Sequence, residues 1–168
     1  SGTFVWYTNL QNLYLYYNQI TSIENGDFNG LSTLNTLNLW INEITSIEND
    51  SFNELGSLIT LILWNNQITS INSWAFDGLY SLNTLYLNYN QITSVENGSF
   101  NDLSALNILH LQYNQITSVE NADFTGLNSL ISFDLSNNQI TSIENDSFNN
   151  LSSLVYLNLG SNIIPLIN

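Results

Sequence analysis

The sequence predicts an α/β-type repeat solenoid, in which similar coils of chain stack side by side around one continuous apolar core. The 168 residues match themselves from end to end when shifted by 24 positions, without insertion or deletion. A fixed period of this length is typical of stacked supersecondary units. Hydrophobic residues make up 43% of the chain, which is enough for such a core. Successive copies begin at Leu10, Leu34, Leu58, Leu82, Leu106, Leu130 and Leu154.

Each copy contains a short strand followed by a polar turn. Leu85 and Leu87 flank the outward residue Tyr86, and this alternation is typical of a strand with one buried face. Asn90 marks the point where the chain leaves β geometry, because asparagine side chains hydrogen-bond nearby backbone groups. The segment that follows is too short for more than one or two helical turns. We therefore expect loop, extended or 3-10 structure there.

One full period reads Leu-x-x-Leu-x-Leu-x-x-Asn-x-Ile-Thr-Ser-Ile-Glu-Asn-x-x-Phe-x-x-Leu-x-x. This pattern resembles the leucine-rich repeat family, in its 24-residue class, over the whole chain, and is similar to extracellular and bacterial members. The resemblance implies a right-handed horseshoe with a parallel β-sheet on the concave face and short loop or 3-10 segments on the convex face. It also implies a ladder of the repeated asparagines and a spine of the repeated phenylalanines.

The repeat frame defines a single domain, 1–168. It consists of a partial N-terminal repeat at 1–9, six repeats at 10–153 and a partial C-terminal repeat at 154–168. Phe4 and Tyr7 already fall on the frame, and Ile164 and Ile167 still fit it. We expect a chain cut from a longer array, or a unit that stacks end to end.

The charge balance restricts the partners. The chain has 14 Asp and Glu residues and no Lys or Arg, so its net charge is −14. Phosphate backbones and anionic membranes repel such a surface, which argues against nucleic-acid binding. No apolar run approaches the length of a membrane span, so we expect no membrane insertion.

A secreted or cell-surface location fits a chain without Lys or Arg, because trypsin-like proteases would find no cleavage site. Cysteine is absent, so no disulfide framework reports on the compartment. Four Asn-x-Ser patterns are glycan acceptors only if the protein is secreted in a glycosylating host. They begin at Asn49, Asn97, Asn145 and Asn150.

The positions that flank the buried leucines vary between copies and are rich in aromatic residues. Tyr and Trp supply rigid contact area with polar tips, which favours a recognition surface. The alternative is that aromatic residues simply suit exposed strands. The expected ligand-binding residues on the concave face are Tyr14, Tyr16, Tyr17, Asn38, Trp40, Ile62, Trp64, Tyr86, Asn88, Tyr89, His110, Gln112, Tyr113 and Asp134.

His110 and Asp134 occupy the same position in successive copies and should be neighbours. With Ser132 or Ser136 they could imitate a Ser-His-Asp triad. However, an open sheet offers no evident oxyanion hole and does not exclude water. A surface ion pair is the favoured interpretation, and we expect no enzyme activity, no catalytic residue and no cofactor.

Glutamates recur once per copy in a second column, which Asn72 interrupts. Stacked carboxylates could bind Ca²⁺, but their spacing matches no calcium-loop motif. We favour a solvated acidic edge and assign no metal site. The column contains Glu24, Glu48, Glu96, Glu120 and Glu144.

The leading functional hypothesis is a non-enzymatic binding or adhesion scaffold that recognises a protein, or alternatively a glycan, through the concave face. The rival is a structural protein that self-assembles head to tail into a filament or surface array, because solenoid ends need caps. Pro165 would end the array only weakly. The apolar ends are Phe4, Val5, Trp6 and Tyr7, and Ile163, Ile164, Leu166 and Ile167.

Overall fold

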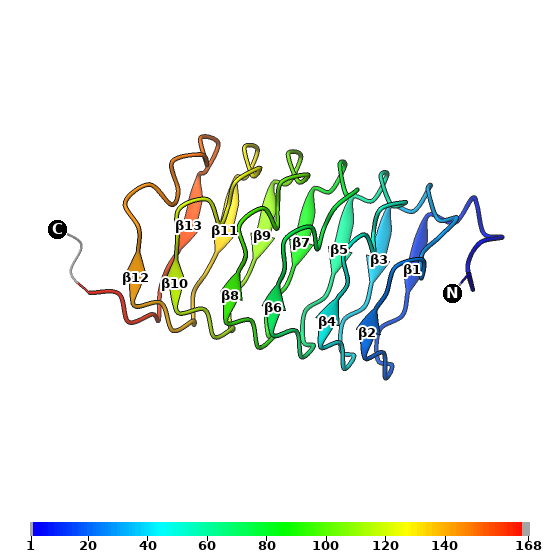
Figure 1. Cartoon of the computed structure of the whole chain (residues 1–168), viewed down its shortest axis with the longest axis horizontal. Coiled ribbons are helices and arrows are strands. Elements are labelled where there is room, and N and C mark those ends of the chain that lie inside the picture. The colour runs from blue at the N-terminus through cyan, green and yellow to red at the C-terminus, as the bar shows by residue number, and fades with distance from the viewer. Residues whose placement is uncertain (1, 166–168) are drawn as a thin grey trace.

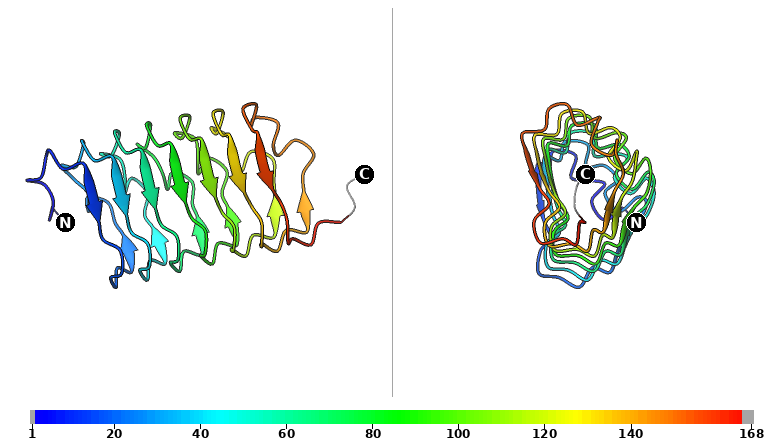
Figure 2. Two further views of the ribbon diagram at one scale, coloured as in Figure 1. Left: turned by 180° about the vertical axis from the view of Figure 1, so that it is seen from behind. Right: turned by 90° about the vertical axis from the view of Figure 1, so that its left-hand side faces the viewer.

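The computed structural model describes residues 2–165, which form a solenoid of stacked coils (Figure 1). Seen end-on, the coils follow one another as similar loops around a common interior (Figure 2). We number the coils from the sequence repeats, so that coil 1 is 10–33 and coil 6 is 130–153. The predicted repeat solenoid is confirmed. Leu166 and Ile167, which were expected at the C-terminal end, lie outside the described residues.

One strand from each coil enters a seven-stranded parallel sheet, whose outward side we call the concave face. Neighbouring strands are in register at a spacing of 24 residues, so that Leu13 lies beside Leu37 and Leu85 beside Leu109. The middle side chains of the inner strands are buried, and the flanking ones point outward. The strands are β1 (Asn12–Tyr14), β3 (Thr36–Asn38), β5 (Thr60–Ile62), β7 (Thr84–Tyr86), β9 (Ile108–His110), β11 (Ser132–Asp134) and β13 (Tyr156–Asn158).

The convex side carries turns and two-residue strands, in agreement with the expected loop or extended structure, and no 3-10 segment or α-helix occurs within residues 2–165. Consecutive single turns connect these strands to the sheet, as where Leu55 N–H donates to Phe52 O and Leu58 N–H donates to Leu55 O, both at 2.9 Å. The convex strands are β2 (Ser22–Ile23), β4 (Ser46–Ile47), β6 (Ser70–Ile71), β8 (Ser94–Val95), β10 (Ser118–Val119) and β12 (Ser142–Ile143).

The convex strands pair two by two, as β2–β4, β6–β8 and β10–β12, so the convex period spans two coils. Within a pair, Gly30 N–H donates to Glu54 Oε2 at 2.8 Å and Gly78 N–H donates to Asp102 Oδ2 at 3.1 Å. Between pairs the coils approach closely, and a Cβ on Gly78 would lie 2.6 Å from the Cα of Asn53. Glycine therefore alternates with larger polar residues, in the order Gly30, Glu54, Gly78, Asp102, Gly126 and Asn150.

Buried serines join the same coil pairs. Ser51 Oγ donates to Ile23 O of the preceding coil at 3.1 Å and to Glu48 O at 2.6 Å. Ser99 and Ser147 repeat this arrangement in coils 4 and 6. Each of these serines is the third residue of an Asn-x-Ser pattern. In three of the four Asn-x-Ser patterns, the serine is therefore explained by the hydrogen bonds that it makes between coils.

The predicted phenylalanine spine is confirmed. Rings of successive coils stack at 5.8–6.2 Å from Phe28 to Phe148, with interplanar angles of 4–24°. Phe133 replaces the usual strand leucine and packs edge-to-face on Phe124 at 4.7 Å. The spine lies beneath the convex side, and the strand leucines fill the interior between it and the sheet.

The predicted asparagine ladder is also confirmed. The Asn90 amide donates to Leu63 O of the preceding coil and to Leu87 O of its own coil, both at 3.0 Å. Its Oδ1 accepts the N–H of Ile68 at 3.0 Å. Buried backbone groups are satisfied in this way, and the ladder fixes the turn that follows each sheet strand. Its members are Asn18, Asn42, Asn66, Asn90, Asn114, Asn138 and Asn162.

Candidate binding face

An aromatic ridge runs along the concave face over the first five coils. Trp40 and Trp64 stack with ring centroids 4.5 Å apart. Tyr89 and Tyr113 stack at 4.4 Å, and Trp64 lies 6.3 Å from Tyr89, which links the two stacks. Tyr17 packs edge-to-face on Trp40 at 5.0 Å. The aromatic ridge comprises Tyr14, Tyr16, Tyr17, Trp40, Trp64, Tyr89 and Tyr113.

The stacks determine which part of each ring a partner can reach. In the Trp40–Trp64 and Tyr89–Tyr113 pairs, each ring gives a face to its neighbour, at interplanar angles of 23° and 7°. The edges and polar tips of the rings remain for contact. Ring edges carry partial positive charge, and the phenol and indole groups donate hydrogen bonds. The aromatic ridge therefore suits a partner rich in carbonyl oxygens and apolar groups.

The turn after each sheet strand holds one residue in the left-handed region. Tyr17, Tyr89 and Tyr113 have φ angles of 56°, 55° and 57° there. Asn65 adopts the same conformation with a φ of 57°, as does Ile41 with a φ of 50°. Asparagine tolerates this region, whereas a β-branched residue is strained in it. The conformation itself therefore does not require a tyrosine.

Several predicted residues have local roles in this turn. Asn38 Oδ1 accepts the N–H of Trp40 at 3.2 Å, and Asp134 Oδ1 accepts the N–H of Ser136 at 2.9 Å. Both side chains are half-buried, as is Ile62. Asn38 and Asp134 therefore help to shape the turn, a role that was not predicted for them.

Asn88 and Gln112 follow the tryptophans in the same column of the concave face. Asn88 was expected to point outward, but it is only 9% exposed. The Oδ1 atom of Asn88 and the Oε1 atom of Gln112 are both buried without a hydrogen-bond partner. Such groups need an explanation, because an unsatisfied buried acceptor costs about 1–3 kcal/mol.

The structure brings His110 beside Asp134, as the sequence predicted. The expected ion pair between them is wrong. Asp134 instead accepts hydrogen bonds from Ser136 N–H and from Asn158 Nδ2 at 3.3 Å. The imidazole packs edge-to-face on Tyr86 at 5.1 Å. Burial lowers the pKa of His110, against the smaller opposite effect of Asp134, so the ring is neutral at pH 7.

The parts of a catalytic triad are not joined. Within the described chain, no hydrogen bond links His110 to Ser132 or Ser136. Likewise, no group of three or more His, Asp and Glu side chains is placed to hold a metal ion in residues 2–165. No helix in this part of the chain is long and apolar enough to cross a membrane.

Negative charge is segregated to the convex side. Of the 14 acidic residues, all but Glu43 and Asp134 belong to the convex segments. The predicted glutamate column is exposed there, yet it is not simply solvated. Glu96 accepts the N–H of Ser73 at 2.9 Å, and Glu144 accepts that of Asn121 at 2.7 Å. The concave face is consequently almost free of formal charge.

Two convex carboxyl groups titrate abnormally. Burial, opposed by a hydrogen bond from Glu120 N–H and assisted by the Glu120 and Glu144 carboxylates, raises the pKa of Asp123 to about 6. Burial, together with the Asp102 and Asp50 carboxylates, raises the pKa of Asp77. Neither group has a Lys or Arg partner, because the chain has none.

The convex side carries two exposed aromatic residues that the sequence analysis did not single out. Trp74 is 50% exposed and has a φ of 68°, and Tyr80 is 62% exposed. Trp74 occupies the column that holds Gly26 and Gly98 in other coils. This departure from the repeat was visible in the sequence. Their position makes them useful controls for the aromatic ridge.

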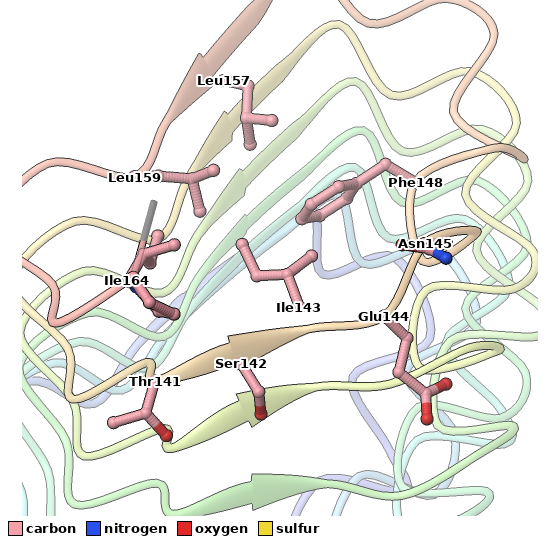
Figure 3. Close-up of a pocket in the computed structure, with 10 residues that line it drawn as sticks. Thr141, Ser142, Ile143, Glu144, Asn145, Phe148, Leu157, Leu159 and Ile164 are labelled. Atoms are coloured by element: carbon pink, nitrogen blue, oxygen red, sulfur yellow. The ribbon is translucent and has the colours of Figure 1, made fainter. Parts of the chain in front are cut away.

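A cavity of about 580 Å³, lined by both apolar and polar side chains, lies at the C-terminal end of the described coils. Leu157 and Ile164 approach it from the last coil, and Ile143 and Phe148 approach it from the convex segment (Figure 3). In the inner coils the next coil fills the equivalent space. Val155 is 84% exposed at the same end.

Comparison with known proteins identifies the repeat. The family model for leucine rich repeat matches residues 8–63, 56–116 and 104–164. A search of solved structures gives 366 matching chains, so the fold by itself selects no ligand. No curated protein sequence matches this chain.

The crystal structure of a TLR13–ssRNA13 complex contains a chain that is similar to this one, with a TM-score of 0.94 and 32% identity. The match covers 100% of this chain and 24% of that chain. The family matches extend over almost all of the described residues. The chain therefore belongs to the leucine-rich repeat family.

Proposed function

We propose that the protein is a non-enzymatic scaffold for protein binding or adhesion, displayed outside the cell or at its surface, and that the aromatic ridge is its binding surface. The leucine-rich repeat fold supports protein interaction in general. The observation that carries the proposal is a row of contiguous rings on a face almost free of formal charge. Such rings dominate the energetics of protein interfaces.

The scaffold does not need these rings. Tyr89 and Tyr113 are 46% and 45% exposed, and Tyr17 is 64% exposed. The same turn position is occupied by Asn65 and Asn137 in other coils, with nearly identical φ angles. Stacking within a pair contributes about 0.5–1.5 kcal/mol. That small gain does not explain seven rings in one continuous row.

A protein fits the aromatic ridge better than RNA or a glycan. Single-stranded RNA stacks its bases on aromatic faces and places its phosphates on basic residues. This chain has no Lys or Arg, and several ridge faces already cover one another. Sugars also use free ring faces. We therefore keep a glycan as the less favoured ligand and exclude RNA from the proposal.

The test compares two variants with the wild-type chain. The ridge variant carries Trp40→Ser, Trp64→Ser, Tyr89→Asn and Tyr113→Asn, which are residue types that the chain itself uses in these columns at Ser136 and Asn65. The control variant carries Trp74→Ser and Tyr80→Ser on the convex side. Each immobilised chain is incubated with cell-surface and secreted proteins of the source organism.

We expect the wild-type and control chains to retain the same bound proteins and the ridge variant to lose them. Equal retention by all three chains would contradict the proposal. Enzymatic removal of glycans from the captured proteins separates the two ligand classes, since only glycan recognition would then be lost. Circular dichroism of both variants checks that the solenoid is intact.

End-to-end self-association is the second proposal, and the apolar side chains that line the C-terminal cavity, such as Ile143, Phe148 and Leu157, support it. Trp6, at the other end, is 87% exposed and Tyr7 is 58% exposed. A second copy could cover both surfaces in a head-to-tail contact. Light scattering over a range of concentrations tests this. The mass should rise with concentration for the wild type and stay at the monomer value for Leu157→Asp, whereas a wild type that is monomeric throughout would contradict it.

A further inference from the structure

Two side-chain amides on the concave face point their oxygens inward and their N–H groups outward. Asn88 Oδ1 and Gln112 Oε1 are the two buried side-chain atoms that lack a hydrogen-bond partner within residues 2–165. The nitrogens of the same amides also donate to no neighbour in this part of the chain, yet they are not buried. The groups that these amides offer to a partner are therefore hydrogen-bond donors.

The tryptophan rings add further donors. Trp40 and Trp64 stack face to face at 4.5 Å. Their indole N–H groups have no acceptor in the described coils and are not buried, and an indole nitrogen can only donate. Two oxygens that could accept from a partner already have donors of their own. Asn38 Oδ1 accepts Trp40 N–H at 3.2 Å, and Asp134 Oδ1 accepts Ser136 N–H at 2.9 Å.

This supply of donors selects an uncharged partner segment that is rich in acceptors. The chain has no Lys or Arg, so it offers no cationic side chain of this kind to a carboxylate or a phosphate. A lysine or arginine side chain of the partner would bring donors alone. These would face the indole and amide N–H groups, which are donors too. A segment with many carbonyl oxygens and few N–H groups is the complementary surface.

We propose that the aromatic ridge binds a proline-rich segment of the protein partner in the polyproline II conformation. This inference rests on the proposed function, since it names the part of the partner that covers the ridge. Each proline contributes a carbonyl oxygen and no N–H group. A polyproline II helix has no internal hydrogen bonds, so its carbonyl groups are free to accept from the indole and amide N–H groups. Because this conformation exists before binding, little conformational entropy is lost.

The spacing of the ring stacks matches the pitch of this helix. The Trp40–Trp64 stack belongs to coils 2 and 3, and the Tyr89–Tyr113 stack belongs to coils 4 and 5. The stacks thus recur every two coils, which is about 9.6 Å at the usual strand spacing. A polyproline II helix advances about 9.3 Å per turn of three residues. Every third residue of a segment laid along the solenoid would therefore meet the next stack.

Two neutral peptides of equal length test the proposal on the whole chain. The probe is acetyl-(Pro)9-amide, which extends about 28 Å and can cover the ridge. The comparison is acetyl-(Ser-Gly)4-Ser-amide, which is flexible and has an N–H group at every residue. Binding is followed by NMR at the indole N–H groups. The oligoproline should shift the signals of Trp40 and Trp64, leave those of Trp6 and Trp74 in place, and bind at least about tenfold more tightly than the comparison peptide.

A double variant, Asn88→Leu with Gln112→Met, removes the two amide donors and leaves the rings in place. It should bind the oligoproline about tenfold more weakly, because two hydrogen bonds are lost. Its fold should be intact, because the buried oxygens that it replaces have no partner. Gln115→Met is the matched control, since Gln115 is an exposed amide of the same coil outside the ridge. It should bind like the wild type, and circular dichroism checks both folds.

Equal affinity for the two peptides would overturn the proposal. Shifts of Trp6 and Trp74 as large as those of Trp40 and Trp64 would do the same, as would unchanged binding by the folded double variant. The proposed function fails separately, in the capture experiment with the ridge variant. A captured protein that needs Trp40 and Trp64 but is not displaced by acetyl-(Pro)9-amide would keep the ridge as the binding surface and reject the proline-rich segment.

Discussion

Replacing Asp123 with asparagine should stabilise the protein at neutral pH. Asp123 is 7% exposed, and its pKa is raised from 3.8 to about 6, chiefly by burial. The folded state therefore binds the proton more tightly than the unfolded state. Stability from this group is fully present below pH 3.8 and is lost as the pH rises through about 6. A shift of about 2 units at 1.36 kcal/mol each corresponds to roughly 3 kcal/mol.

Asparagine keeps the acceptor that the fold uses, since Glu120 N–H donates to Asp123 Oδ2 at 2.8 Å. It removes the charge that the Glu120 and Glu144 carboxylates oppose. We therefore expect Asp123→Asn to raise the free energy of unfolding by up to about 3 kcal/mol at pH 7 and to leave it nearly unchanged at pH 3.5.

Urea denaturation of both chains between pH 3.5 and pH 7, followed by circular dichroism, measures the difference. Asp27→Asn is the control. Asp27 holds the same column and accepts Glu24 N–H at 2.9 Å, but it is less buried. Its effect should be smaller. A difference for Asp123→Asn that does not change with pH, or a less stable variant at pH 7, would refute the electrostatic reasoning.

Three further substitutions test the scaffold by urea denaturation. Ile41→Asn should raise the free energy of unfolding by about 1 kcal/mol, because Ile41 has a φ of 50° and asparagine tolerates the left-handed region. A lower free energy of unfolding would show that Ile41 is not strained there. Gly78→Ala should lower the free energy of unfolding by at least about 2 kcal/mol, because the added Cβ would collide with the Asn53 backbone and the φ of Gly78 is 86°. The control Gly56→Ala should leave stability nearly unchanged, because a Cβ there would have no neighbour closer than 3.8 Å. Asn90→Leu should lower the free energy of unfolding by about 3 kcal/mol or more, because two backbone carbonyls and one N–H would be left without their buried hydrogen-bond partner. A decrease of less than about 1 kcal/mol would contradict the stabilising role of the asparagine ladder.

The repeating columns made the scaffold predictable from the sequence. Leu85, Asn90 and Phe100 recur at one spacing, so each must meet its copy in the next coil. The pairing of coils on the convex side was not predicted, although its signal was present. Glycine at 30, 78 and 126 alternates with Glu54 and Asp102, and this alternation appears only when two periods are compared.

The concave face was predictable in location but not in detail. Column positions placed the aromatic rings on one surface, but they could not show that Tyr89 stacks on Tyr113. They also could not show that Asn88 is buried, or that Asp134 bonds to Ser136 N–H instead of His110. Side-chain torsions and competition for hydrogen bonds decide these features, and neither follows from periodicity.

Site-specific photo-cross-linking tests the central claim most directly. A benzophenone side chain is introduced at position 64 in the aromatic ridge, or at position 74 on the convex side, and each chain is irradiated with the surface proteins of the source organism. If the aromatic ridge is the binding surface, the chain labelled at position 64 should cross-link to a discrete partner, and the chain labelled at position 74 should not. The same products from both positions, or products from position 74 alone, would contradict the assignment of the concave face as the binding surface.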